Sequence, residues 1–158
     1  MNYEDWIATV PKDFTGDSLW KMTVYRLALF LSDISWQDVT KLAQDRRTES
    51  LSNQLYRSLC SIGANLAEGY SYSTGGNRAR YFEYALGSAR ESREWYFRGR
   101  HILGDPVVEH RLSYLTRIVQ MLIVAMPLQR KVSLREEREP YETESIGPEV
   151  FEDIPMPD

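Results

Sequence analysis

Apolar residues recur every three or four positions along four stretches of the chain, and polar residues fill the positions between them. This period is that of an amphipathic helix that buries one face against its neighbours. No stretch alternates apolar and polar residues over enough positions to indicate a strand. Asp17 and Ser18 are both good N-caps for the first predicted helix. The predicted helices cover residues 17–34, 49–68, 78–103 and 106–126.

Residues that break or cap helices define the predicted connections. A long connector, 35–49, follows the first helix and is expected to contain a short helical turn. Gly69 is placed to end the second helix before the turn 70–77, since glycine accepts the left-handed conformation common at helix C-termini. The Gly-Asp-Pro sequence at 104–106 ends the third helix and starts the fourth, which we expect to end at Pro127. Short connections favour antiparallel neighbours, so the predicted fold is an all-α, antiparallel, up-and-down four-helix bundle.

Length and composition suit one folded domain with a tail. The chain has 158 residues, of which 42% are hydrophobic. We predict an N-terminal extension (1–16), a four-helix domain (17–131) and a C-terminal tail (132–158). The start of the chain lacks an apolar segment typical of a secretory signal, and no run of about 18 apolar residues would span a membrane. The lone Cys60 excludes an intramolecular disulfide, so we expect a cytoplasmic protein.

Charge is distributed unevenly along the chain. Residues 135–158 contain nine acidic residues and two arginines, a net charge of −7, whereas residues 1–134 carry +3. Four of the seven prolines also lie in this acidic tail, which predicts a solvated, disordered extension. The alternative is a segment that docks on a basic surface of its own or a neighbouring subunit. Its apolar anchors would be Tyr141, Ile146, Val150, Phe151 and Ile154.

Small residues occur at helical spacing in the second and third predicted helices. A glycine inside a helix costs about 1 kcal/mol relative to alanine, so Gly63 and Gly87 need a packing reason. Close approach between helices, within the domain or between subunits, would supply that reason. The remaining small residues of this set are Ala64, Ala67, Ala85, Ser88 and Ala89.

The same two helices carry a family motif. It runs Arg57-Ser58-x-x-Ser61-Ile62-x-x-Asn65-Leu66-Ala67-Glu68-Gly69, then Phe82, then Ala85-Leu86-Gly87-Ser88-x-x-Glu91. This motif resembles the signature of the four-helix-bundle family related to the 23S rRNA intervening-sequence protein, and the resemblance extends over residues 18–130. The chain departs from the family pattern in its acidic extension, its long first connector, and Leu66, where isoleucine is usual.

The resemblance implies an assembly and a class of partner. Members of that family resemble small cyclic homo-oligomers, commonly pentamers, with a basic surface around a central channel. Some are encoded within insertions of ribosomal RNA genes. A distant relative is an accessory protein that binds nucleic acid and a reverse transcriptase. The motif residues to which we assign a structural role, from their positions in the helices, are Asn65, Glu68, Gly69, Gly87 and Ser88.

Asn65 and Glu68 lie three residues apart near the predicted end of the second helix. We interpret Asn65 as a hydrogen-bond partner of the turn backbone. A carboxylate near a helix C-terminus opposes the helix dipole, so Glu68 is expected to pair with an arginine of another helix. The candidate partners are Arg57, Arg80 and Arg90. A catalytic carboxylate would need a second acid or a histidine beside it, which favours the structural role.

The third predicted helix is rich in arginine, interleaved with aromatic residues. Phosphate neutralisation and flat stacking surfaces are what nucleic-acid binding requires. The alternative is that Arg90–Glu94 and Glu94–Arg98 form pairs within the helix while the aromatic residues pack in the core. The turn 73–78 is a second candidate phosphate site, through backbone N–H groups and Arg78. The candidate nucleic-acid-binding residues are Arg57, Arg78, Arg80, Arg90, Arg93, Arg98 and Arg100.

No catalytic or cofactor motif accompanies these residues. The two histidines, His101 and His110, form neither a Glu-x-x-His pair nor a zinc-binding spacing, and no phosphate-binding loop or nucleophile elbow occurs. We therefore expect a protein that is not an enzyme and needs no metal or cofactor. Two hypotheses follow: a ring-forming protein that binds RNA or DNA, or an oligomeric scaffold that binds a protein partner without contacting nucleic acid.

Overall fold

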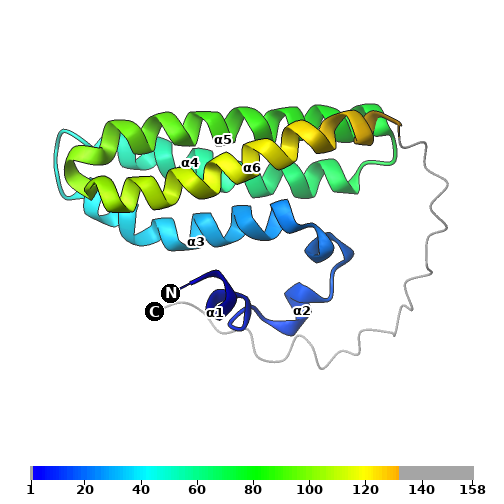
Figure 1. Ribbon diagram of the computed structural model, residues 1–158, viewed down its shortest axis with the longest axis horizontal. Helices are drawn as coiled ribbons and strands as arrows, with labels where there is room; N and C mark the ends of the chain where they lie inside the picture. The colour runs from blue at the N-terminus through cyan, green and yellow to red at the C-terminus, as the bar shows by residue number, and fades with distance from the viewer. Residues whose placement is uncertain (1, 132–158) are drawn as a thin grey trace, which may run out of the picture.

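The computed structural model describes residues 2–131, and every regular element in that range is helical (Figure 1). The predicted all-α class is confirmed. The predicted acidic tail lies outside the described residues. The elements are α1 (Tyr3–Ile7), α2 (Lys12–Thr15), the 3-10 helix η1 (Ser18–Lys21), α3 (Thr23–Ala43), α4 (Glu49–Ser71), α5 (Gly75–Leu103) and α6 (Asp105–Lys131).

The four long helices lie alongside one another around one core (Figure 1). Each of them packs against the next in the chain, and α3 also contacts α5 and α6. All four contribute large side chains that are almost fully buried, and each such side chain stabilises the fold by about 1.5–3 kcal/mol. These side chains include Phe30, Leu31, Leu55, Ile62, Leu66, Phe82, Tyr96, Leu115, Ile118 and Leu122.

The first long helix continues through most of the predicted connector 35–49 and ends only at Ala43. The predicted boundary was wrong because the buried stripe of α3 continues through Ser35 and Asp38 to Leu42. Polar residues occupy two of these core positions, so the apolar period fades although the helix does not.

Four other predicted boundaries also differ from the structure. Asp17 caps η1 through a 2.8 Å bond from the amide of Leu19, and an extended residue separates η1 from α3. The helix α4 continues past Gly69 to Ser71, and α5 begins at Gly75. The helix α6 continues through Pro127, which is exposed, so that water can reach the backbone carbonyl that the proline leaves without a donor.

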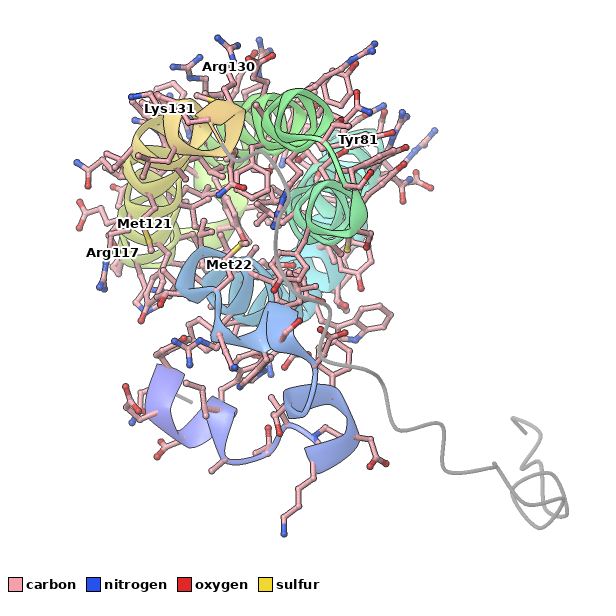
Figure 2. All side chains as sticks on the ribbon, turned by 90° about the vertical axis from the view of Figure 1, so that its right-hand side faces the viewer. Met22, Tyr81, Arg117, Met121, Arg130 and Lys131 are labelled. Carbon is pink, nitrogen blue, oxygen red and sulfur yellow. The ribbon has the colours of Figure 1, made fainter. Side chains whose placement is uncertain are left out.

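The N-terminal segment packs on the α3 side of the molecule, away from α5 (Figures 1 and 2). Trp6 is buried, with its ring 6.1 Å from that of Trp20 and 5.5 Å from that of Phe30. Its indole Nε1 donates a 2.7 Å hydrogen bond to Asp33. The predicted extension 1–16 thus adds an aromatic layer to the core.

Candidate nucleic-acid interface

The structure separates the seven candidate arginines by their surroundings. Arg57 on α4 and four arginines of α5 are exposed, whereas Arg100 is half-buried and Arg78 is buried. The exposed α5 arginines are Arg80, Arg90, Arg93 and Arg98.

Arg78 does not face solvent. Its side chain is 6% exposed and its guanidinium lies 5.0 Å from the centre of the Tyr70 ring, in cation–π geometry. Position 78 falls on the buried face of α5 with Phe82 and Ala85, so its burial follows from the helix register. The candidate phosphate site in the turn 73–78 therefore lacks the exposed arginine that it was predicted to offer.

Two further arginines of α5 have partners within their own helix. Arg98 forms the predicted pair with Glu94 at 2.6 Å, one helical turn away. The guanidinium of Arg100 lies over the Phe97 ring, 4.1 Å from its centre. The predicted pair of Arg90 with Glu94 is not among the ion pairs of residues 2–131. Arg98 and Arg100 therefore each have a partner within α5 that occupies part of the guanidinium.

Three tyrosines gather on the surface where α4 ends and α5 begins, and we call Tyr72, Tyr81 and Tyr84 the tyrosine cluster. The rings of Tyr72 and Tyr81 stack with their centres 5.0 Å apart and their hydroxyls 3.2 Å apart. Tyr84 meets Tyr81 edge-on at 5.6 Å. Arg80 adds a positive charge, because its Nε donates a 2.7 Å hydrogen bond to the Tyr84 hydroxyl. In Figure 2, Tyr81 lies at the outer edge where α4 and α5 meet.

The tyrosine cluster has a carboxylate beside it. Hydrogen bonding to Tyr72 and then to the Glu68 carboxylate raises the pKa of Tyr81, so this phenol stays neutral at physiological pH. The predicted pairing of Glu68 with Arg57, Arg80 or Arg90 is absent among the ion pairs of the described residues. The group that the Glu68 carboxylate acts on is therefore the neighbouring Tyr81 phenol.

The remaining motif residues serve the helices themselves. Asn65 donates a 2.8 Å hydrogen bond from Nδ2 to the Ser61 carbonyl of its own helix, so the predicted bond to the turn is wrong. The carbonyl of Ser88 accepts from the Ser92 hydroxyl, which also meets the Ser58 hydroxyl at 2.8 Å between α4 and α5. These bonds satisfy polar groups at a buried helix contact.

The two motif glycines have different surroundings. A Cβ atom on Gly69 would lie 2.8 Å from the Cβ of Tyr81 and 3.3 Å from the carbonyl oxygen of Arg78. Gly69 therefore allows α4 and α5 to approach closely, and it does not end α4 as predicted. Gly87 is exposed, and nothing lies within 4 Å of where its Cβ would be. Packing within the described residues gives Gly87 no reason to be glycine.

The outer face of α6 carries an apolar surface that we call the α6 stripe: Ile123, Val124, Pro127 and Leu128. Ile123, Val124 and Leu128 are 46%, 66% and 58% exposed, although they are large and hydrophobic. By length and composition alone, α6 could also cross a membrane, whereas its inner face packs against α5 and α3. Exposed apolar residues on neighbouring turns of one helix form a candidate interaction surface.

Comparison with known proteins identifies the class of protein to which this fold and motif belong. Residues 20–123 match the family described as 23S rRNA-intervening sequence protein, and the chain belongs to that family. The match ends before most of the α6 stripe and begins after α1 and α2.

A solved structure supports the fold. The chain resembles a crystal structure of a protein of unknown function from the S23 ribosomal protein family of Bacteroides thetaiotaomicron. The two share 22% sequence identity with a TM-score of 0.62, and the alignment covers 66% of this chain and 98% of the other. No curated protein matches the chain significantly.

Proposed function

We propose that this chain is a non-enzymatic protein that binds RNA or DNA through exposed arginines on α4 and α5. The observation that carries this proposal is that four exposed arginines of α4 and α5 form no ion pair within residues 2–131: Arg57, Arg80, Arg90 and Arg93. An arginine fork without a carboxylate remains able to bind phosphate oxygens in two-pronged geometry. The family description, which refers to an intervening sequence of 23S rRNA, is consistent with a nucleic-acid partner.

The arrangement that we propose is an antiparallel, up-and-down four-helix bundle that assembles into a cyclic homo-oligomer. The short connections between α4, α5 and α6 support the antiparallel order. The α6 stripe supports self-assembly, since a second copy would remove its apolar side chains from water. Open space at Gly87 leaves room for another backbone to approach. In a ring, the arginine cluster of each copy is repeated around the axis, and the fields of these clusters add.

Fluorescence anisotropy with labelled RNA and DNA strands tests the binding. The full chain and a 1–134 variant should bind at about 50 mM salt, and affinity should fall steeply as salt rises. Replacing Arg90 and Arg93 with Glu should abolish binding, whereas Lys12→Glu with Lys21→Glu, the same charge change at exposed positions ahead of α3, should have little effect. Failure of both proteins to bind either strand at low salt would contradict the proposal.

Light scattering during size-exclusion chromatography tests the assembly. The wild-type chain should elute as an oligomer, and Val124→Asp with Leu128→Asp should reduce it to a monomer. Ser113→Asp, an exposed polar position about three turns before Val124 on the same helix, is the control and should leave the mass unchanged. A monomeric wild-type protein would exclude the ring.

An oligomeric scaffold that binds only protein is the second candidate function. The net charge of −4 and the −7 carried by residues 135–158 favour it, because this charge repels nucleic acid unless the tail is displaced. Purification from cells with and without nuclease separates the two functions. A partner that is retained after nuclease treatment supports the scaffold, and a partner that is lost supports nucleic-acid binding.

A further inference from the structure

We propose that the tyrosine cluster, together with Arg80, is a stacking site for an unpaired base of single-stranded nucleic acid. The inference rests on the proposed function and names the form of nucleic acid that the protein takes. It starts from a contact that does not involve the arginines: Tyr72, at the end of α4, stacks on Tyr81, near the start of α5.

The cluster offers the surfaces that base stacking needs. Tyr72 is 36% exposed and Tyr84 is 45% exposed, whereas Tyr96, farther along α5, is fully buried. The stacked pair fixes the orientation of two rings before any ligand arrives, which lowers the ordering cost of binding. Aromatic faces of this kind accept any base, because every base has a flat π-face.

The charges around the cluster fit one nucleotide better than a duplex backbone. Arg80 uses Nε for the bond to Tyr84, which leaves the two terminal amino groups of its guanidinium for a phosphate. Glu68 beside Tyr81 would repel a phosphate but can accept a hydrogen bond from a base amino group. Glu83 is paired with Arg130, so its charge is compensated. A cation and an acceptor thus flank a flat surface.

Base faces are accessible only where a strand is unpaired. In a duplex the faces are covered by stacking on neighbouring base pairs, and a protein contacts mainly phosphates and groove edges. Exposed tyrosine rings therefore add affinity for a single strand and none for a duplex. Arginines elsewhere on α4 and α5 would contact the phosphates of either form.

The experiment uses the full chain, a 12-nucleotide RNA strand with one 2-aminopurine, and the duplex of the same sequence. Stacking on the cluster should quench the 2-aminopurine fluorescence, and the strand should bind about tenfold more tightly than the duplex. The Tyr72→Leu, Tyr84→Leu double variant should lose this preference and the quenching, while duplex binding stays unchanged. The Tyr72→Phe, Tyr84→Phe double variant keeps both rings, so it should retain the preference for the single strand and the quenching.

Phe97→Leu is the matched control, since Phe97 is another exposed aromatic residue of α5 with an arginine over its ring. It should behave as wild type. If wild type binds both forms equally without quenching, or if the double Leu variant keeps the preference, the inference is overturned and the proposed function stands. If wild type binds neither form, the proposed function fails as well. A change of oligomeric mass in the Leu variant without loss of strand affinity would assign the cluster to a contact between copies and overturn the inference.

Discussion

The hydroxyl of Tyr96 on α5 donates a 2.9 Å hydrogen bond to the carboxylate of Asp38 on α3, across 58 positions of sequence. The same carboxylate accepts two bonds from Arg111 of α6, at 2.8 and 3.2 Å. Burial, and then the charge of Asp38, raises the pKa of Tyr96, so the phenol remains a donor. One carboxylate therefore links three helices in a nearly dry interior.

Asp38→Ala should destabilise the protein by about 3 kcal/mol, because it leaves Arg111 half-buried without its counter-charge. Tyr96→Phe removes one hydrogen bond to a charged group and should cost about 1.5–3 kcal/mol. Urea unfolding followed by circular dichroism measures both. Glu94→Ala breaks the exposed pair with Arg98 and should change stability by less than about 0.5 kcal/mol. Equal effects of Asp38→Ala and Glu94→Ala would contradict the role of the buried network.

This network also explains where the sequence was misleading about the fold. Four long helices could be predicted because their apolar residues keep the helical period. The second half of α3 could not, because Ser35 and Asp38 occupy buried positions and their partners lie on other turns or other helices. A polar residue satisfied by a distant partner looks the same in sequence as a residue of a solvated loop.

Only part of the candidate interface could be predicted from the sequence. Arginine-rich composition identified α5, and helical register could have placed Arg78 on the buried face with Phe82. The pairing of Tyr72 with Tyr81 depends on the direction in which the chain re-enters α5 after a three-residue connection. The number of residues between Tyr72 and Tyr81 does not reveal the direction of the chain between α4 and α5.

Two glycine substitutions should have opposite effects on stability. Gly69→Ala places a Cβ 2.8 Å from the Tyr81 Cβ, which forces α4 and α5 apart, and should cost about 1–3 kcal/mol. Gly87→Ala meets no atom within 4 Å and should stabilise α5 by about 0.5–1 kcal/mol. Thermal unfolding of both variants at a fixed protein concentration checks the signs. If Gly87→Ala lowers both stability and oligomeric mass, Gly87 lies in a contact between copies.

Stability should fall as the solution becomes acidic below about pH 6.5. Burial, and then the neighbouring Arg111, lowers the pKa of His110 from 6.5, so the folded chain binds fewer protons at this site than the unfolded chain. Fewer protons in the folded state mean that stability rises with pH across this window and is lost as pH falls through it. The neutral ring accepts a 2.8 Å hydrogen bond from Arg111 at Nδ1, which protonation would remove.

Urea unfolding at pH 7.5, 6.5 and 5.5 measures this slope. Ordinary carboxylates titrate at about pH 4, so they remain charged at all three pH values. His110→Gln should flatten the slope and leave stability at pH 7.5 nearly unchanged. A slope that is identical in the variant and in the wild type would assign the acid sensitivity to other groups.

Trp6 should be essential to the attachment of the N-terminal segment. Its ring is 6% exposed and lies among the rings of Trp20 and Phe30. Trp6→Ala should therefore cost about 3 kcal/mol, through lost burial and the cavity left behind. Asp33→Ala removes only the acceptor of the indole N–H and should cost about 1 kcal/mol.

Denaturant unfolding distinguishes an attached segment from an independent one. If α1 and α2 unfold together with the long helices, Trp6→Ala should lower the midpoint and leave a single transition. If the substitution instead releases the segment alone, the urea dependence of unfolding should decrease, because less surface remains to be exposed. Phe14→Ala is the matched control. Phe14 is 46% exposed and contacts Trp20 edge-on, so this substitution should lower stability much less than Trp6→Ala. A midpoint unchanged by Trp6→Ala, with the same urea dependence, would show that residues 2–16 contribute nothing to the stability of the core that they cover.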